Sequence, residues 1–159
     1  MYKLYRQKIK GGIAVDEIKV GEYVRTKNGL IGKVNKIELK GSGTRFAGEY
    51  LTDTIIQFND GKVYERRVKD NYIVKHSKNI IDLIELGDII EVVTEEDFEE
   101  EYTDKLEVAA VGITDCKGNK LNEIGICGDH GIEYVALKDI RIILTHEQYE
   151  RNCYRLENN

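Results

Sequence analysis

One pattern of hydrophobic and polar positions occurs twice in this chain, at two places sixty-six positions apart. Residues 15–24 read Val-Asp-Glu-Ile-Lys-Val-Gly-Glu-Tyr-Val, and residues 81–90 read Ile-Asp-Leu-Ile-Glu-Leu-Gly-Asp-Ile-Ile. A second pair of similar segments follows, Val68–Val74 and Leu137–Ile143, and each contains Lys-Asp and two aliphatic residues three positions later. Repetition at a fixed spacing indicates a duplicated structural unit.

The repeat divides the chain into residues 1–78, which include an N-terminal arm, and residues 79–159. Short segments bounded by glycine and asparagine, several of them with alternating polarity, predict five strands in each unit. In the first unit we expect strands at residues 22–26, 30–37, 54–58, 62–68 and 72–75. In the second unit we expect them at residues 89–94, 106–114, 121–127, 133–137 and 141–144.

Turn and helix signals complete this prediction. Asn28-Gly29 is a strong signal for a two-residue hairpin turn, because such turns need positive φ angles. The polar, glycine-rich residues 38–48 predict an exposed loop. Ser77 can cap a helical turn over residues 79–83, and Thr145 with Gln148 forms a capping-box pattern. We therefore expect a C-terminal helix over residues 147–156.

The arrangement of these elements resembles a known small fold. Five short strands, with a tight hairpin before the fourth and a short break before the last, resemble the SH3-like β-barrel. Residues 20–34, with a glycine, a strand, the Asn-Gly turn and Gly32-Lys33-Val34, resemble the nucleic-acid-associated KOW motif. The resemblance implies a mainly β protein of two tandem small SH3-like β-barrels, with short helical turns and a C-terminal helix.

A second resemblance concerns the whole chain. Residues 76–84 and 143–150 carry it most clearly, and over residues 13–156 the chain resembles small accessory proteins of bacteriophages and prophages of Gram-positive hosts. That family has no assigned activity, so the resemblance implies a genomic setting and no site residues. It implies a phage gene of the kind that counters host defence, as anti-CRISPR proteins do, or redirects host machinery.

Composition fits a folded protein of the cell interior. Hydrophobic residues make up 41% of the chain and charged residues 33%, which is typical of a globular domain. No apolar run approaches the roughly 18 residues of a membrane span. The three cysteines, Cys116, Cys127 and Cys153, form no disulfide framework, which favours a reducing compartment. We expect the host bacterial cytoplasm and no contact with membranes.

Charge separates the two units. Residues 1–78 contain 17 Lys and Arg against 9 Asp and Glu, a net charge of +8, whereas residues 79–159 contain 7 against 20, a net charge of −13. Such asymmetry is informative about binding partners. It indicates that the two copies share a scaffold and perform different tasks, and opposite charges could also pair two copies of the chain.

The basic unit offers candidate contacts to nucleic acid. Cations stand around the Asn28-Gly29 turn, along the following strand, in the glycine-rich loop and before the Lys69-Asp70 break, and Phe46 adds a ring beside a cation, as nucleic-acid sites do. These candidates are Arg25, Lys27, Lys33, Lys36, Lys40, Arg45, Phe46, Arg66 and Arg67. The alternatives are an ordinary solvated surface and a surface that meets the acidic unit.

The acidic unit has the sharpest local feature, six carboxylates within residues 95–101. Such dense like charge resists packing and predicts an exposed loop. Its carboxylates could imitate phosphates towards a basic groove of a host protein or ribonucleoprotein, with two rings as anchors; the alternative is a solubilising insertion. The candidates are Glu95, Glu96, Asp97, Phe98, Glu99, Glu100, Glu101 and Tyr102.

No set of residues indicates catalysis or a cofactor. Cys116, Cys127 and His130 fall short of the four ligands of a structural zinc site unless Asp129 joins them, and no third group would orient a Cys-His pair. Residues 41–45 lack the Gly-Lys-Ser/Thr ending of a phosphate-binding loop. We therefore expect a non-enzymatic protein, with no metal and no cofactor, that binds a host macromolecule through the acidic unit; the alternative is a nucleic-acid-binding module that uses the basic first unit.

Overall fold

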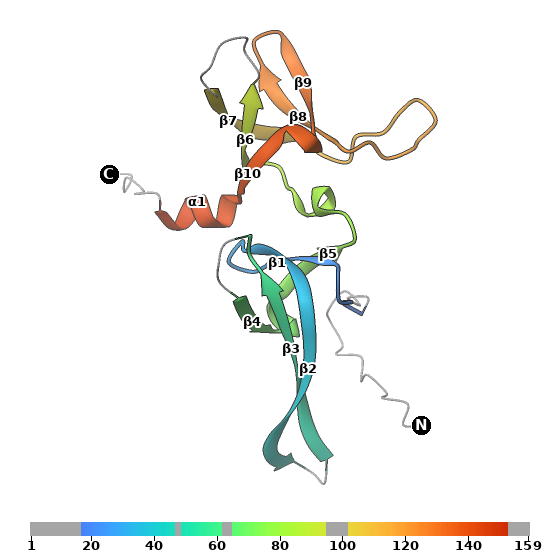
Figure 1. Cartoon of the computed structure of the whole chain (residues 1–159), viewed down its shortest axis with the longest axis vertical. Coiled ribbons are helices and arrows are strands. Elements are labelled where there is room, and N and C mark those ends of the chain that lie inside the picture. The colour runs from blue at the N-terminus through green and yellow to red at the C-terminus, as the bar shows by residue number, and fades with distance from the viewer. Residues whose placement is uncertain (1–16, 47–48, 62–64, 95–101, 153–159) are drawn as a thin grey trace, which may run out of the picture.

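The structure, a computed structural model, describes residues 17–46, 49–61, 65–94 and 102–152. They form two five-stranded antiparallel sheets, one in each half of the chain, and the two halves lie end to end (Figure 1). The predicted mainly β class is confirmed. None of the helices in these ranges is both long and apolar enough to cross a membrane.

The first sheet has the strand order β4-β3-β2-β1-β5. A short 3-10 helix, η1 (Asp70–Tyr72), stands between the fourth and fifth strands, where the sequence predicts a break. The strands are β1 (Tyr23–Thr26), β2 (Ile31–Phe46), β3 (Glu49–Asn59), β4 (Glu65–Lys69) and β5 (Ile73–Ser77).

The second sheet repeats this plan. Its strand order is β10-β6-β7-β8-β9, which is the order of the first sheet read from the opposite edge, and a 3-10 helix, η3 (Leu137–Asp139), again precedes the last strand. The strands are β6 (Ile89–Thr94), β7 (Tyr102–Ala110), β8 (Glu123–Gly128), β9 (Gly131–Ala136) and β10 (Ile140–Leu144).

The repeated segments adopt the same local structure in both units. Gly21 and Gly87 have φ angles of 90° and 85°, a region that favours glycine. The residues after them, Glu22 and Asp88, each accept a hydrogen bond from the backbone N–H three positions earlier, at 3.0 and 2.8 Å. The duplication inferred from sequence therefore extends to single hydrogen bonds.

Each unit has its own apolar core. Ile18 belongs to the first cluster, and its counterpart in the repeat, Ile84, belongs to the second. The first cluster also contains Val24, Val34, Ile56, Phe58 and Ile73. The second also contains Ile90, Val92, Val108, Ile124 and Ile126. The 3-10 helix η2 (Ile80–Leu83) connects the units, where Ser77 Oγ accepts a hydrogen bond from the Asn79 N–H at 3.1 Å.

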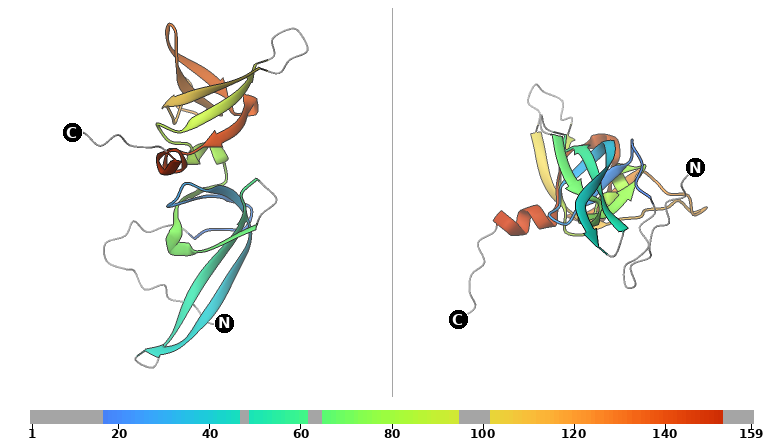
Figure 2. Two further views of the ribbon diagram at one scale, coloured as in Figure 1. Left: turned by 90° about the vertical axis from the view of Figure 1, so that its left-hand side faces the viewer. Right: turned by 90° about the horizontal axis from the view of Figure 1, so that it is seen from below.

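The prediction of a loop at residues 38–48 is wrong over most of its length. Strand β2 continues to Phe46 and pairs with β3, with Gly41 opposite Thr52 and Arg45 opposite Tyr50. The resulting β2–β3 ribbon leads away from the second unit (Figures 1 and 2). Local composition indicated a loop, but backbone pairing between two adjacent strands extends through the glycines.

Two further details differ from the sequence prediction. The hairpin at Asn28-Gly29 exists, but its loop has three residues, because the Thr26 N–H donates to the Leu30 carbonyl at 2.9 Å. Strand β7 begins at Tyr102 and ends at Ala110, several residues before the predicted strand 106–114. Pairing with β6 sets the start of β7, because Thr94 lies opposite Tyr102, and pairing with β8 extends it to Ala110.

The C-terminal helix α1 spans His146–Asn152, within one residue of its predicted start. The Thr145 hydroxyl, predicted to cap this helix, donates a hydrogen bond to the Gly29 carbonyl at 2.7 Å. Among the described residues, no pairing joins the two outer strands of either sheet, so the two barrels remain a prediction.

Candidate functional site

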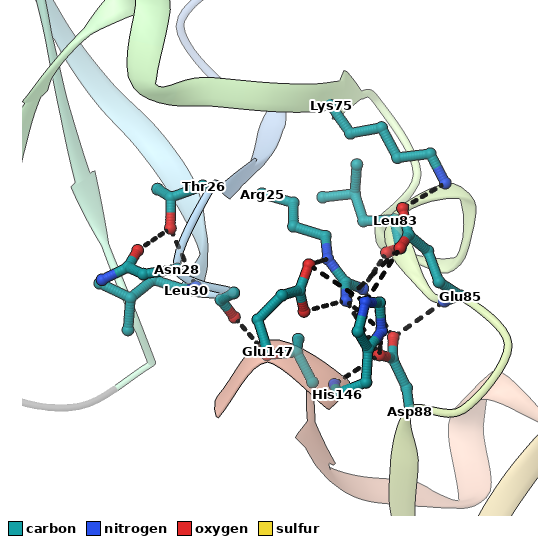
Figure 3. Close-up of polar contacts among 12 residues, drawn as sticks. Arg25, Thr26, Asn28, Leu30, Lys75, Leu83, Glu85, Asp88, His146 and Glu147 are labelled. Atoms are coloured by element: carbon teal, nitrogen blue, oxygen red, sulfur yellow. Dashed lines mark hydrogen bonds and ion pairs between the residues drawn. The ribbon is translucent and has the colours of Figure 1, made fainter. Parts of the chain in front are cut away.

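Arg25 of β1 lies buried between the two units, with none of its surface exposed (Figure 3). The prediction that it contacts nucleic acid on the surface is therefore wrong. Alternation along β1 does place it on the outer face of the first sheet, because Val24 points into the core. The second unit covers that part of the face.

The guanidinium of Arg25 uses all of its nitrogen atoms. Nη1 and Nη2 donate to the two carboxylate oxygens of Asp88 at 2.6 and 2.9 Å, and Nη1 also donates to the Leu83 carbonyl at 2.8 Å. Nε and Nη2 donate to the two oxygens of Glu147 at 3.1 and 2.5 Å. Arginine suits this position because its rigid, planar fork matches two carboxylates at once.

Three elements bring these groups together. Arg25 comes from β1, Asp88 from the turn before β6, and Glu147 from the first turn of α1 (Figure 3). At the edge of this contact, Gly29 lies so close to Thr145 that a Cβ atom there would stand 2.2 Å from the Thr145 hydroxyl. The junction is thus a close contact between the β1–β2 turn and the start of α1.

Ionisation strengthens this junction. Burial opposes the charge on Arg25, but its hydrogen bonds to Asp88 and Glu147 outweigh burial and raise the pKa of Arg25. Burial also opposes the charges on Asp88 and Glu147, and the Arg25 hydrogen bonds nevertheless lower the pKa of both carboxyl groups. Their stabilising contribution is therefore present above the unfolded-state pKa of about 4 and is lost as the pH falls through the lower folded-state pKa.

Glu85 and His146 surround the guanidinium on its more open side. His146 Nδ1 lies 3.0 Å from Asp88, and Glu85 Oε2 lies 3.6 Å from Arg25 Nη2. Glu85, His146 and Glu147 could in principle converge on a metal ion, since their ligand atoms lie within 4.8 Å of one another. Arg25 already neutralises part of this charge, so the group is better described as an ion-pair network.

Sequence reasoning did not find this network. Arg25 and Glu147 are separated by 122 positions, and no local pattern connects them. The available signal was the repeat, because Asp88 occupies the position of Glu22. In the first unit that carboxylate faces His76 Nδ1 at 2.9 Å, and in the second it faces an arginine of the other unit.

Four of the nine basic candidates of the first unit lie on one sheet face, together with Lys69. Lys36 lies opposite Gln57 of β3, which lies opposite Arg67 of β4, while the neighbouring Phe58 points into the core. Side chains alternate between the two faces along each strand. The bulge between Val34 and Lys36 shifts the register by one residue, so Lys33 and Lys36 point to the same face. We call the result the basic face, formed by Lys33, Lys36, Lys40, Arg67 and Lys69.

The remaining basic candidates lie elsewhere. Arg66 is on the opposite face from Arg67 and donates to Asp60 at 3.1 Å. Lys27, at the β1–β2 turn, places its ammonium 6.0 Å from the centre of the Tyr72 ring. Arg45 and Phe46 are known only as paired backbone positions near the end of β2.

An acidic side chain, Glu38, lies among the cations of the basic face. Glu38 accepts hydrogen bonds or ion pairs from Lys36, at 2.6 Å, and from Arg67. Its pKa is lowered, chiefly by the contact with Lys36. A phosphate that binds here would share these two cations with Glu38.

A groove of about 650 Å³ lies at the junction and meets the basic face at Lys33. Its lining comes from both units, with Tyr23 and Asn59 from the first and Arg141 from the second. The Lys33 ammonium lies 5.7 Å from the centre of the Tyr23 ring. The rest of the lining is mostly aliphatic: Ile31, Ile80, Leu137, Ile140 and Ile143.

Most of the acidic candidates, residues 95–101, lie outside the described residues, and Tyr102 is described only as the first backbone position of β7. In chain order they connect β6 to β7. The equivalent connection in the first unit, between β1 and β2, is the short turn at Lys27–Leu30. The acidic stretch is therefore an insertion specific to the second unit.

Comparisons with protein-family models, with curated proteins and with solved structures found no match.

Proposed function

We propose that this protein is a non-enzymatic, phage-encoded interaction protein whose first unit binds the phosphate backbone of nucleic acid through the basic face. The observation that carries the proposal is the strand register, which aligns Lys36 with Arg67 and places five cations on one face. The KOW-like segment at residues 20–34 gives independent support, because β1 and the start of β2 form part of this sheet.

Electrostatics makes the basic face suitable for phosphates. Seven positions separate Lys33 from Lys40 on β2, a length of roughly 20 Å in an extended strand. Strands β2 and β4 are separated by one strand, so their cations form two rows about 10 Å apart. A surface of this kind attracts a polyanion without reading its sequence, and its affinity falls as salt concentration rises.

The groove at the junction extends this surface. Tyr23 and Lys33 place a ring and a cation at its edge, and aromatic rings are common stacking partners of unpaired bases. We therefore assign single-stranded nucleic acid as the preferred form, with phosphates along β2 and a base at the groove.

We also propose that each unit is SH3-like. The support is the strand order β4-β3-β2-β1-β5, its repetition in the second sheet, and the 3-10 helix before the last strand of each. The task of this scaffold is to hold two different surfaces in a fixed arrangement.

The test is fluorescence anisotropy with a labelled 20-nucleotide oligothymidylate at 25 to 300 mM salt. A double variant, Lys36→Glu with Arg67→Glu, should weaken binding by more than about tenfold and flatten the salt dependence, because two phosphate contacts are lost. The matched control is Arg66→Glu with Lys78→Glu, which makes the same change of charge away from the basic face, because Lys78 follows β5 at the opposite edge of the sheet from β4. It should bind more strongly than the first double variant. Equal loss in both variants, or no binding of the wild type at 25 mM salt, would contradict the proposal.

A second function is favoured by the charge of the other unit. Its described residues, 79–94 and 102–152, include 13 carboxylates against 6 Lys and Arg, before the insertion at residues 95–101 is counted. This unit could occupy a basic surface of a host factor, as an anti-defence inhibitor that imitates nucleic acid would. If the wild type binds no oligonucleotide but captures a basic host protein through Glu99, Glu100 and Glu101, this function replaces the first.

A further inference from the structure

We propose that strand β9 is a docking edge that binds an extended, basic peptide segment of a partner protein by adding it to the second sheet. Strand β9 is the last strand of its sheet, and among the described residues it pairs only with β8. The backbone N–H and C=O groups on its outer side could therefore pair with a strand of another chain. This proposal concerns the second unit and is independent of the basic face of the first.

The side chains of β9 are unusually apolar for an exposed edge. Ile132 is 52% exposed and Tyr134 is 60% exposed, and alternation places both on the face that points away from the core. Gly125 lies opposite Tyr134 and has no side chain to cover the ring. Ile132 packs over Gly125, where an added Cβ would stand 2.8 Å from Ile132 Cγ2.

The equivalent strand of the first unit shows the contrast. Strand β4 occupies the same place in the strand order and reads Glu-Arg-Arg-Val-Lys, with four of its five residues charged. Charged residues on an edge strand prevent pairing with other chains. Strand β9 reads Gly-Ile-Glu-Tyr-Val-Ala and contains a single charged residue, so the edge that is protected in one unit is open in the other.

The negative charge near β9 indicates that a segment bound there would be basic. Residues 121–137, which contain the β8–β9 hairpin, include three carboxylates and no Lys or Arg. These carboxylates are Glu123, Asp129 and Glu133. Glu123 lies opposite Ala136, on the same outer face as Tyr134. A segment that alternates aliphatic and basic residues would place aliphatic side chains against Ile132 and Tyr134 and its cations on the other face, on the side of Glu133.

The test uses a fluorescein-labelled eight-residue peptide of alternating valine and lysine as the probe, with the full-length protein. We expect saturable binding, with backbone amide signals of β9 shifting in NMR spectra. Ile132→Lys with Tyr134→Lys should weaken binding at least tenfold, because it removes the apolar contact and adds like charge to the edge. The matched control is Ile142→Lys on β10, the opposite edge strand, where the isoleucine is 49% exposed; this variant should bind the probe normally.

Two further probes separate strand addition from simple charge attraction. A peptide with N-methyl groups on alternate amides keeps its charge but cannot pair with a strand, and it should bind at least tenfold more weakly. A glutamate-valine peptide should not bind. Absence of binding by the lysine-valine peptide, or equal binding by its N-methylated form, would overturn the proposal.

Two other outcomes are informative. If sedimentation shows a wild-type dimer that Ile132→Lys dissociates, the edge pairs with a second copy of this chain and the peptide proposal is overturned. The variant Lys36→Glu with Arg67→Glu should bind the peptide as the wild type does. Peptide binding lost in that variant would place the site on the first unit and contradict the assignment to β9.

Discussion

A buried arginine is stable only when its charge and its hydrogen-bond donors are satisfied. Arg25 meets this requirement by drawing Asp88 and Glu147 of the second unit against β1 of the first. Gly29 is also required at this contact, because the second unit leaves no room for a side chain at that position. The contact between the units thus depends on a few single residues.

Gly29→Ala tests the closeness of this contact, and Gly118→Ala is its matched control. Both glycines have nearly equal φ angles, 82° and 83°, so alanine strains the backbone similarly at each. Only at Gly29 would the new Cβ collide with Thr145, whereas Gly118 faces open space. We expect Gly29→Ala to lower the free energy of unfolding by at least about 1 kcal/mol more than Gly118→Ala in urea titrations. Equal losses would mean that the two units are not in close contact.

Secondary structure shows where local sequence is informative. Strand β6 was predicted with its observed limits, because aliphatic residues fill it and Gly87 precedes it. The same reasoning failed for β2, because Gly41 and its neighbours have low strand propensity and only pairing with β3 makes them extended. The basic face could be predicted in part, since alternation separates Arg66 from Arg67. Its assembly could not, because register between three strands is a property of the fold.

Gly41→Thr tests the continuation of the β2–β3 ribbon. The backbone of Gly41 is not in the positive-φ region, a Cβ there meets open space, and the residue lies opposite Thr52. Threonine has a higher strand propensity than glycine and should therefore stabilise this extended backbone by up to about 1 kcal/mol. We expect slower hydrogen exchange of the backbone amides near Gly41 and Thr52. Unchanged or faster exchange would support the loop that composition alone indicated.

The whole molecule is a duplicated scaffold whose copies have diverged. Both units keep the strand order, the 3-10 helix and the turn at Gly21 or Gly87, whereas their surfaces differ. The first carries the basic face, and the second carries the acidic insertion and the apolar edge β9. The repeat and the opposite charges could be predicted from sequence. The junction could not, because Asp88 and Arg25 become partners only when the units pack together.

The central claim is that Arg25 joins the two units into one body, and a double-mutant cycle tests it most directly. Unfolding in urea would be measured for the wild type, Arg25→Met, Asp88→Asn and the double variant. Each single variant should cost about 3–5 kcal/mol, because it leaves a buried charge without its partner. The double variant should be more stable than the sum of the two losses predicts, by about 2 kcal/mol or more. The same cycle on the exposed pair Arg67 and Glu38 should show coupling below about 1 kcal/mol. Additive losses for Arg25 and Asp88 would contradict the account, because additivity means that the two residues have no interaction free energy.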